Sequence, residues 1–115
     1  MSTLKIYQIL SNEGIFMLEG SSKPMKKVTI TVSGRVQGVG FRYHTKLIAD
    51  QIGVTGTVEN MMDGSVFIKV SAPSEKLDTF IEALKNNKPS FSRVDSVDIT
   101  EKSDLPEFSS FKVIH

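Results

Sequence analysis

The 115-residue sequence contains no cysteine, which excludes disulfide bonds, thiol catalysis and cysteine metal sites. Its net charge is only +1, so no broad electrostatic field would attract nucleic acid or an anionic membrane. No apolar run approaches the length that a membrane-spanning helix needs. The first residues also lack the unbroken apolar stretch of a signal peptide, because residues 12–14 interrupt it. We therefore expect a protein of the reducing cytoplasm that binds neither nucleic acid nor a membrane.

The character of the chain changes near Met25. Residues 1–24 end in the run of loop-forming residues Glu19–Pro24, and a strongly patterned segment follows. We predict an N-terminal extension over residues 1–24, poorly ordered or loosely docked, and one folded domain over residues 25–115. The alternative is that the apolar residues of the extension pack an extra helix or strand on the domain.

Alternating and helical patterns succeed one another after Met25. Apolar residues alternate at Val28, Ile30 and Val32, as in a half-buried strand. A helical pattern that stops at Gly53 follows, and Ser74 is expected to cap a second helix. We predict strands near residues 26–33, 54–60, 66–70, 94–99 and 108–114. We predict one helix over residues 41–52 and a second that begins after Ser74 and ends before Pro89.

The order βαββαβ plus a terminal strand is typical of the ferredoxin-like class. We expect an α+β sandwich, in which two helices cover one face of an antiparallel sheet and a short extra strand lies at the C-terminus.

The segment Gly34–Arg42, read GRVQGVGFR, lies between the first predicted strand and the first helix. Glycines let successive backbone N–H groups form a concave anion site, and a following helix N-terminus adds partial positive charge. An arginine at the exit can close on a phosphate with two N–H groups. The alternative is that this segment is only a tight turn between the strand and the helix and binds no ligand. We predict a phosphate cradle made by the backbone of Gln37, Gly38, Val39, Gly40, Phe41 and Arg42.

This string resembles the first signature of the acylphosphatase family. Asn60 follows Arg42 by 18 residues, and with Asp63-Gly64 just beyond it resembles the second signature. The similarity extends over residues 26–114. Thr57 and Glu59 depart from the family pattern, which usually has an aromatic residue and a basic residue or glutamine there. Strand alternation sends both side chains to the face opposite Asn60, so we expect them to affect packing or the rim of the site.

The resemblance implies metal-independent hydrolysis of acyl phosphates to a carboxylate and inorganic phosphate, which also inhibits. It implies that Arg42 binds the phosphate and that Asn60, which has both a donor and an acceptor, orients the attacking water. A carboxylate leaves easily, so no acid and base pair is needed. No cofactor or metal is expected, since neither His44 nor His115 has metal-ligand spacing. We expect a monomer.

Three other functions stay open. A relative that prefers carbamoyl phosphate and a catalytically silent anion-binding module would share the cradle. An RNA-binding domain of the same fold would carry several aromatic residues on a central strand, whereas residues 65–71 offer only Phe67.

Overall fold

The computed structural model describes residues 24–115. The predicted extension therefore lies almost wholly outside the described residues, and the boundary at Met25 stays a prediction. Within residues 24–115, no helix combines the length and the apolar character needed to cross a bilayer.

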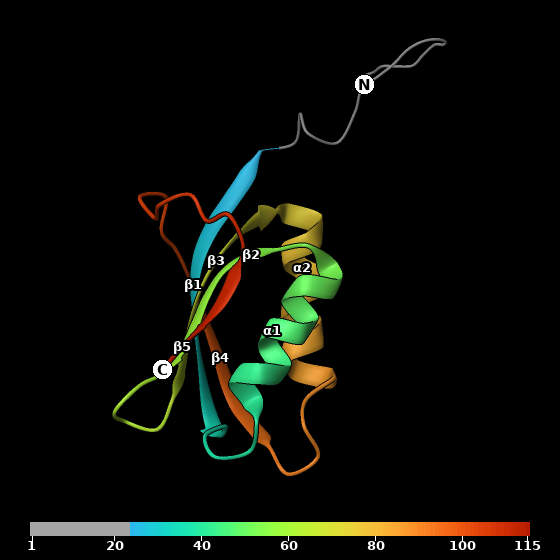
Figure 1. Ribbon diagram of the computed structural model, residues 1–115, viewed down its shortest axis with the longest axis vertical. Coiled ribbons are helices and arrows are strands. Elements are labelled where there is room, and N and C mark those ends of the chain that lie inside the picture. The colour runs from blue at the N-terminus through green and yellow to red at the C-terminus, as the bar shows by residue number, and fades with distance from the viewer. Residues whose placement is uncertain (1–23) are drawn as a thin grey trace, which may run out of the picture.

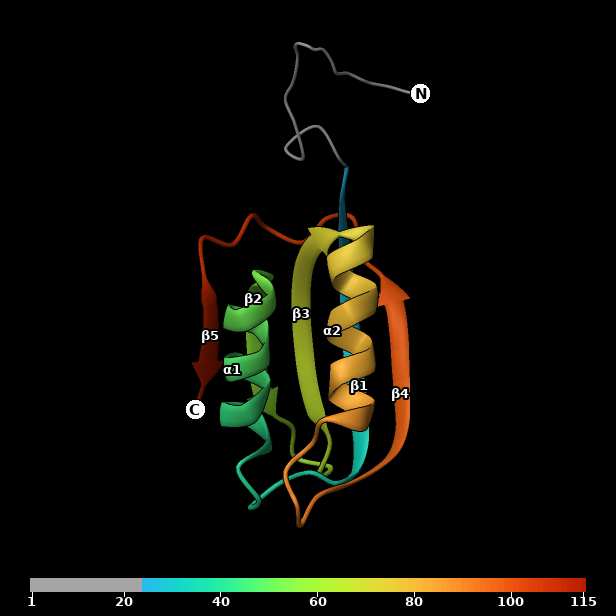
Figure 2. The same cartoon turned by 90° about the vertical axis from the view of Figure 1, so that its right-hand side faces the viewer.

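The described chain forms five strands and two helices, in the predicted order. Both helices cover the same face of the sheet (Figures 1 and 2), which confirms the ferredoxin-like α+β fold. The elements are β1 (Met25–Arg35), α1 (Phe41–Ile52), β2 (Thr55–Asn60), β3 (Val66–Pro73), α2 (Ser74–Asn86), β4 (Arg93–Glu101) and β5 (Phe111–Ile114).

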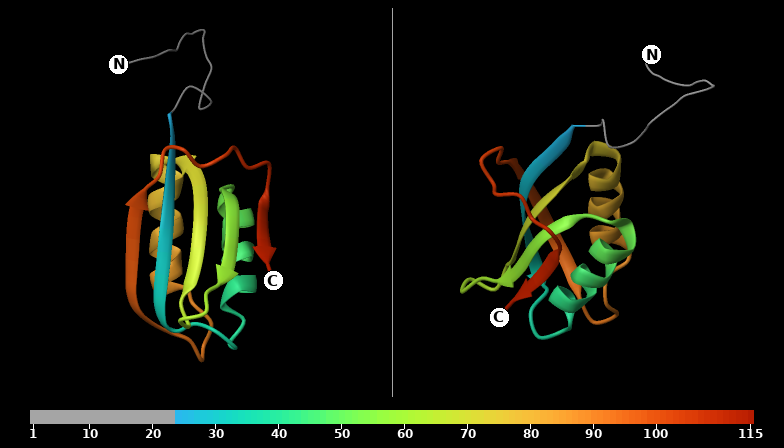
Figure 3. Two further views of the ribbon diagram at one scale, coloured as in Figure 1. Left: turned by 90° about the vertical axis from the view of Figure 1, so that its left-hand side faces the viewer. Right: turned by 45° about the horizontal axis from the view of Figure 1, so that its top comes forward.

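The strands lie in the order β4-β1-β3-β2-β5, as the left view of Figure 3 shows. All neighbouring strands are antiparallel except β2 and β5, which are parallel. The sheet is thus mixed, because the chain crosses one end of the sheet after β4 and returns along its far edge (Figure 2). Since β1 and β2 are both antiparallel to β3, and β5 is parallel to β2, these three strands run the same way. Their carboxyl ends therefore lie at the same end of the sheet, the shared strand edge.

The core lies between the sheet and the two helices. Alternation along β1 buries Val28, Ile30 and Val32, while the residues between them are only partly buried. Between α2 and the sheet, the rings of Phe80 on α2 and Phe111 on β5 lie with their centroids 6.0 Å apart. This contact packs α2 against β5.

The ends of the helices differ in how well the sequence predicted them. α1 ends at Ile52 as expected, and the N–H of Gly53 donates to the carbonyl of Ala49. The expected cap of α2 by Ser74 is wrong, because β3 continues to Pro73 and Ser74 is already the first helical residue. The N-cap position is occupied by Pro73, so the Ser74 hydroxyl lies one residue after the position from which a side chain caps the first N–H groups.

Candidate active site

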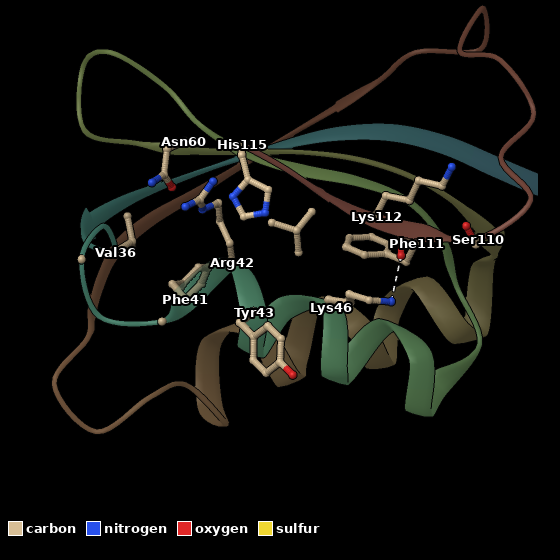
Figure 4. A pocket seen from close by; sticks show the side chains of 13 residues that line it. Val36, Phe41, Arg42, Tyr43, Lys46, Asn60, Ser110, Phe111, Lys112 and His115 are labelled. Carbon is tan, nitrogen blue, oxygen red and sulfur yellow. Dashed lines mark hydrogen bonds between the residues drawn. The ribbon is translucent and has the colours of Figure 1, made fainter.

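The shared strand edge brings together three segments that are distant in sequence. The loop after β1, the end of β2 and the end of β5 line one pocket of about 640 Å³ against α1 (Figure 4). Its lining residues are Val36, Gly38, Gly40, Phe41, Arg42, Tyr43, Lys46, Asn60, Ser110, Phe111, Lys112, Val113 and His115. No carboxylate side chain is among these lining residues of the described chain.

Two glycines of the predicted cradle have a left-handed backbone conformation. Gly38 and Gly40 have φ angles of 75° and 79°, in the left-handed region that favours glycine. A Cβ atom at either position would meet no atom within 4 Å, so the conformation rather than the available space calls for glycine. Val36 is buried and Val39 packs partly against the core, which anchors the loop between its glycines.

The backbone N–H groups of the cradle are unused. Within residues 24–115, the N–H groups of residues 37–42 donate no hydrogen bond to a protein atom. Gly40 is the N-cap of α1 and no side chain caps the helix, so the positive end of the helix dipole is open to a ligand. A row of such donors is suited to an oxyanion.

Arg42 lies half-buried in the first turn of α1, and its guanidinium lies beside Asn60 and His115 in Figure 4. Its Nη1 atom donates a hydrogen bond of 2.8 Å to the carbonyl of Ile114, at the end of β5. It makes no other hydrogen bond or ion pair with the described residues. The guanidinium is therefore held in place while most of its donors stay available for an anion.

Asn60 ends β2, where it pairs with Val66 of β3. Its Oδ1 atom is buried and accepts no hydrogen bond from any described residue. Figure 4 shows this side chain directed toward the guanidinium of Arg42. A buried acceptor without a donor costs about 1–3 kcal/mol, so this oxygen is suited to accept from a water or a ligand N–H or O–H.

The sequence did not reveal the wall that α1 and β5 form beyond the cradle. Tyr43, Lys46 and Val113 line this part of the pocket. Lys46 Nζ donates to the carbonyl of Phe111 at 3.0 Å and pairs with Asp50 at 2.8 Å, so its charge is partly neutralised. Lys46 follows Arg42 by four residues on α1, which places its side chain near that of Arg42. The pairing of β5 beside them depends on distant residues, so no local pattern predicts it.

Other residues considered from the sequence lie elsewhere or differ from expectation. His44 contacts the carbonyl of Asn87 beyond α2 and does not line the pocket, whereas His115 does line it. Thr57 and Glu59 pair with Lys69 and Phe67 of β3 and are not among the lining residues of the described chain. In residues 24–115, no group of three or more His, Cys, Asp or Glu side chains is placed to hold a metal ion.

The turn after Asn60 is ordered by Asp63. The hydroxyl of Ser65 donates to Asp63 Oδ1 at 2.6 Å, and the Ser65 N–H donates at 3.0 Å. The hydroxyl bond first, and then the backbone bond, hold the pKa of Asp63 below its ordinary value. The turn therefore carries an ionised carboxylate close to the end of β2.

Known proteins are similar to this chain over most of its length. The family model "Acylphosphatase" matches residues 28–113. An acylphosphatase of Enterococcus faecalis is 52% identical over 90 residues, which span 78% of this chain and 99% of that protein. The crystal structure of acylphosphatase from Bacillus subtilis superposes with a TM-score of 0.74 at 38% identity, covering 80% of this chain and 100% of the other. HypF of T. kodakarensis matches with a TM-score of 0.71 at 32% identity, over 76% of this chain but only 12% of its own. The chain belongs to the acylphosphatase family.

Proposed function

We propose that the protein hydrolyses acyl phosphates with a backbone cradle and Arg42 as the phosphate site and Asn60 as the residue that orients water. Membership of the acylphosphatase family supports the reaction class. The single observation that supports the assignment of roles is that unused donors and one unused acceptor share a pocket. The donors are the backbone N–H groups of Gly38, Gly40, Phe41 and Arg42 and the guanidinium N–H groups that do not bond the Ile114 carbonyl. Gln37 and Val39 of the predicted cradle are not among the lining residues of the described chain, and the acceptor is Asn60 Oδ1.

In this proposal the phosphoryl oxygens accept hydrogen bonds from the cradle and from Arg42. These donors neutralise the charge that develops on the equatorial oxygens as the bond to the acyl oxygen lengthens. They are already in position, so little reorganisation opposes the reaction.

Asn60 Oδ1 accepts a hydrogen bond from the attacking water and so aims its lone pair at phosphorus. The new bond forms between the water oxygen and phosphorus, and the bond between phosphorus and the acyl oxygen breaks. The carboxylate departs with the electron pair without needing a proton. The water proton passes to an oxygen of the phosphoryl group, and inorganic phosphate remains in the cradle.

The test is turnover of benzoyl phosphate in the presence of EDTA by the wild type, Arg42→Ala and Asn60→Ala. We expect turnover by the wild type, and a loss of about a hundredfold or more in either variant, as for removal of one oxyanion donor. Inorganic phosphate should inhibit competitively, with affinity kept in Asn60→Ala and lost in Arg42→Ala. Arg93→Ala, at an exposed arginine outside the pocket, is the matched control.

The outcomes separate the parts of the proposal. Turnover that survives in Arg42→Ala rejects the phosphate site. Full activity in Asn60→Ala rejects only the orientation of water. A requirement for a divalent metal rejects the metal-independent mechanism.

We further propose that the enzyme acts as a monomer in the cytoplasm, with small acyl phosphates as its only partners. All residues of the proposed mechanism come from one chain, which supports the monomer, and the absence of cysteine suits a reducing compartment. Light scattering that gives a dimer mass at working concentration would contradict the monomer.

A further inference from the structure

The side chain of Gln37 joins the cradle to the turn that follows Asn60. Its Nε2 atom donates to the carbonyl of Met61 at 2.8 Å and to the carbonyl of Ser65 at 2.9 Å. A primary amide has two N–H donors, so this pair of bonds uses both. Met61 and Ser65 form the neck of the turn, where the Met61 N–H donates to the Ser65 carbonyl at 2.8 Å. Gln37 thus bridges the two sides of the neck.

No other hydrogen bond within residues 24–115 joins residues 36–42 to residues 60–65. β1 precedes the loop and pairs with β3, which follows the turn, but β3 separates β1 from β2, which carries Asn60. The sheet ladder therefore links Asn60 to the loop only through β3, and the Gln37 side chain adds a direct link between the loop and the turn.

We infer that Gln37 is a positioning residue, which sets the place of Asn60 relative to the cradle and Arg42. The inference rests on the proposed role of Asn60 in orienting water. The link is short, because the Met61 carbonyl belongs to the residue next to Asn60. In the proposed function, phosphate is held by backbone N–H groups of the loop and by the Arg42 guanidinium, none of which bonds to a described residue of the turn. Loss of the bridge should therefore misplace the water more than it weakens the binding of phosphate.

The variant Gln37→Met tests this inference, because methionine keeps the unbranched length, removes both donors and adds no charge. We expect kcat on benzoyl phosphate to fall about tenfold, the scale expected for a modest misplacement of the reacting group. The competitive inhibition constant of inorganic phosphate should stay within about twofold of the wild type. Gln51→Met is the matched control, since Gln51 is exposed on α1 and makes no hydrogen bond through its side chain in the described part.

A double variant shows whether Gln37 acts through Asn60. In the Asn60→Ala background, Gln37→Met should change kcat by less than about twofold, because the group that it positions is gone. A similar tenfold loss in both backgrounds would overturn the inference, and so would an unchanged kcat in Gln37→Met alone. Full activity in Asn60→Ala also overturns it, but leaves phosphate binding by the cradle and Arg42 intact. The failure of each proposal is thus recognised separately.

A measurement on the wild type covers the case in which Gln37→Met does not fold. With both N–H groups bonded, the amide protons of the Gln37 side chain should exchange with water more slowly than those of Gln51 in NMR spectra. Equal, fast exchange of the two side chains would contradict the bridge.

Discussion

The guanidinium of Arg42 is held by the backbone carbonyl of Ile114, through a hydrogen bond of 2.8 Å between residues 72 positions apart. A neutral carbonyl orients the guanidinium and leaves its charge in place. A carboxylate would orient it too, but would also neutralise its charge. The last strand of the fold therefore takes part in setting the proposed phosphate site through a backbone carbonyl.

This relationship predicts that Arg42→Lys will not preserve activity. One ammonium group cannot bond the Ile114 carbonyl and also present a planar pair of donors to phosphate. We expect kcat/KM on benzoyl phosphate to fall roughly ten- to a hundredfold, in line with about 1.5–3 kcal/mol for a charged hydrogen bond. Arg93→Lys changes an exposed arginine paired with Asp95 and should leave the kinetics unchanged. Wild-type activity in Arg42→Lys would show that a point charge is enough.

The glycines of the cradle give a second prediction. Gly38→Ala or Gly40→Ala should cost about 1–2 kcal/mol of stability, because alanine disfavours the left-handed backbone, and should also shift the loop and weaken phosphate inhibition. Gly53→Ala is the control, since Gly53 has a φ angle of 91° at the far end of α1. Thermal unfolding and the inhibition constant of phosphate should be measured together. Weaker inhibition should appear only in the cradle variants, and its absence from both would contradict the cradle.

Local patterns were enough to predict most of the fold. The alternation along β1 and the glycine stop of α1 depend on nearby residues, so the sequence locates them well. The parallel pairing of β5 with β2 depends on how a long connection crosses the sheet, which no local pattern encodes. The cap at Ser74 failed for a related reason, because the extent of β3 decides where α2 begins.

The site shows the same division between local and distant contacts. Gly38 and Gly40 led to the prediction of the cradle, because glycine is the residue type that most readily adopts the positive φ angles found there. Asn60 alone would have fitted a simple turn, and the spacing of the family signatures was needed to single it out. The bridge from Gln37 and the bond to Ile114 join residues 24 to 72 positions apart, so no local pattern could predict them.

The predicted boundary at Met25 is testable by shortening the chain. A protein that begins at Met25 should keep its kcat and its melting temperature, because residues 25–115 by themselves contain a buried core and the pocket. The family model likewise starts at residue 28. Circular dichroism and turnover of benzoyl phosphate would measure both quantities. A large drop in melting temperature would show that residues 1–24 pack on the domain.

The turn after Asn60 should respond to acid through Asp63. Its pKa is lowered by the hydrogen bonds from Ser65, so the ionised form is favoured in the folded protein. A lowered folded pKa means that the stabilisation is present above the ordinary pKa of Asp63 and is lost as the pH falls through the folded value. Ser65→Ala removes the larger cause, so the pKa of Asp63 should rise toward its ordinary value in a carboxyl NMR titration. The pKa of Asp95, which Arg93 lowers, serves as the internal control and should not move. An unchanged Asp63 titration in Ser65→Ala would mean that the hydroxyl does not order this turn.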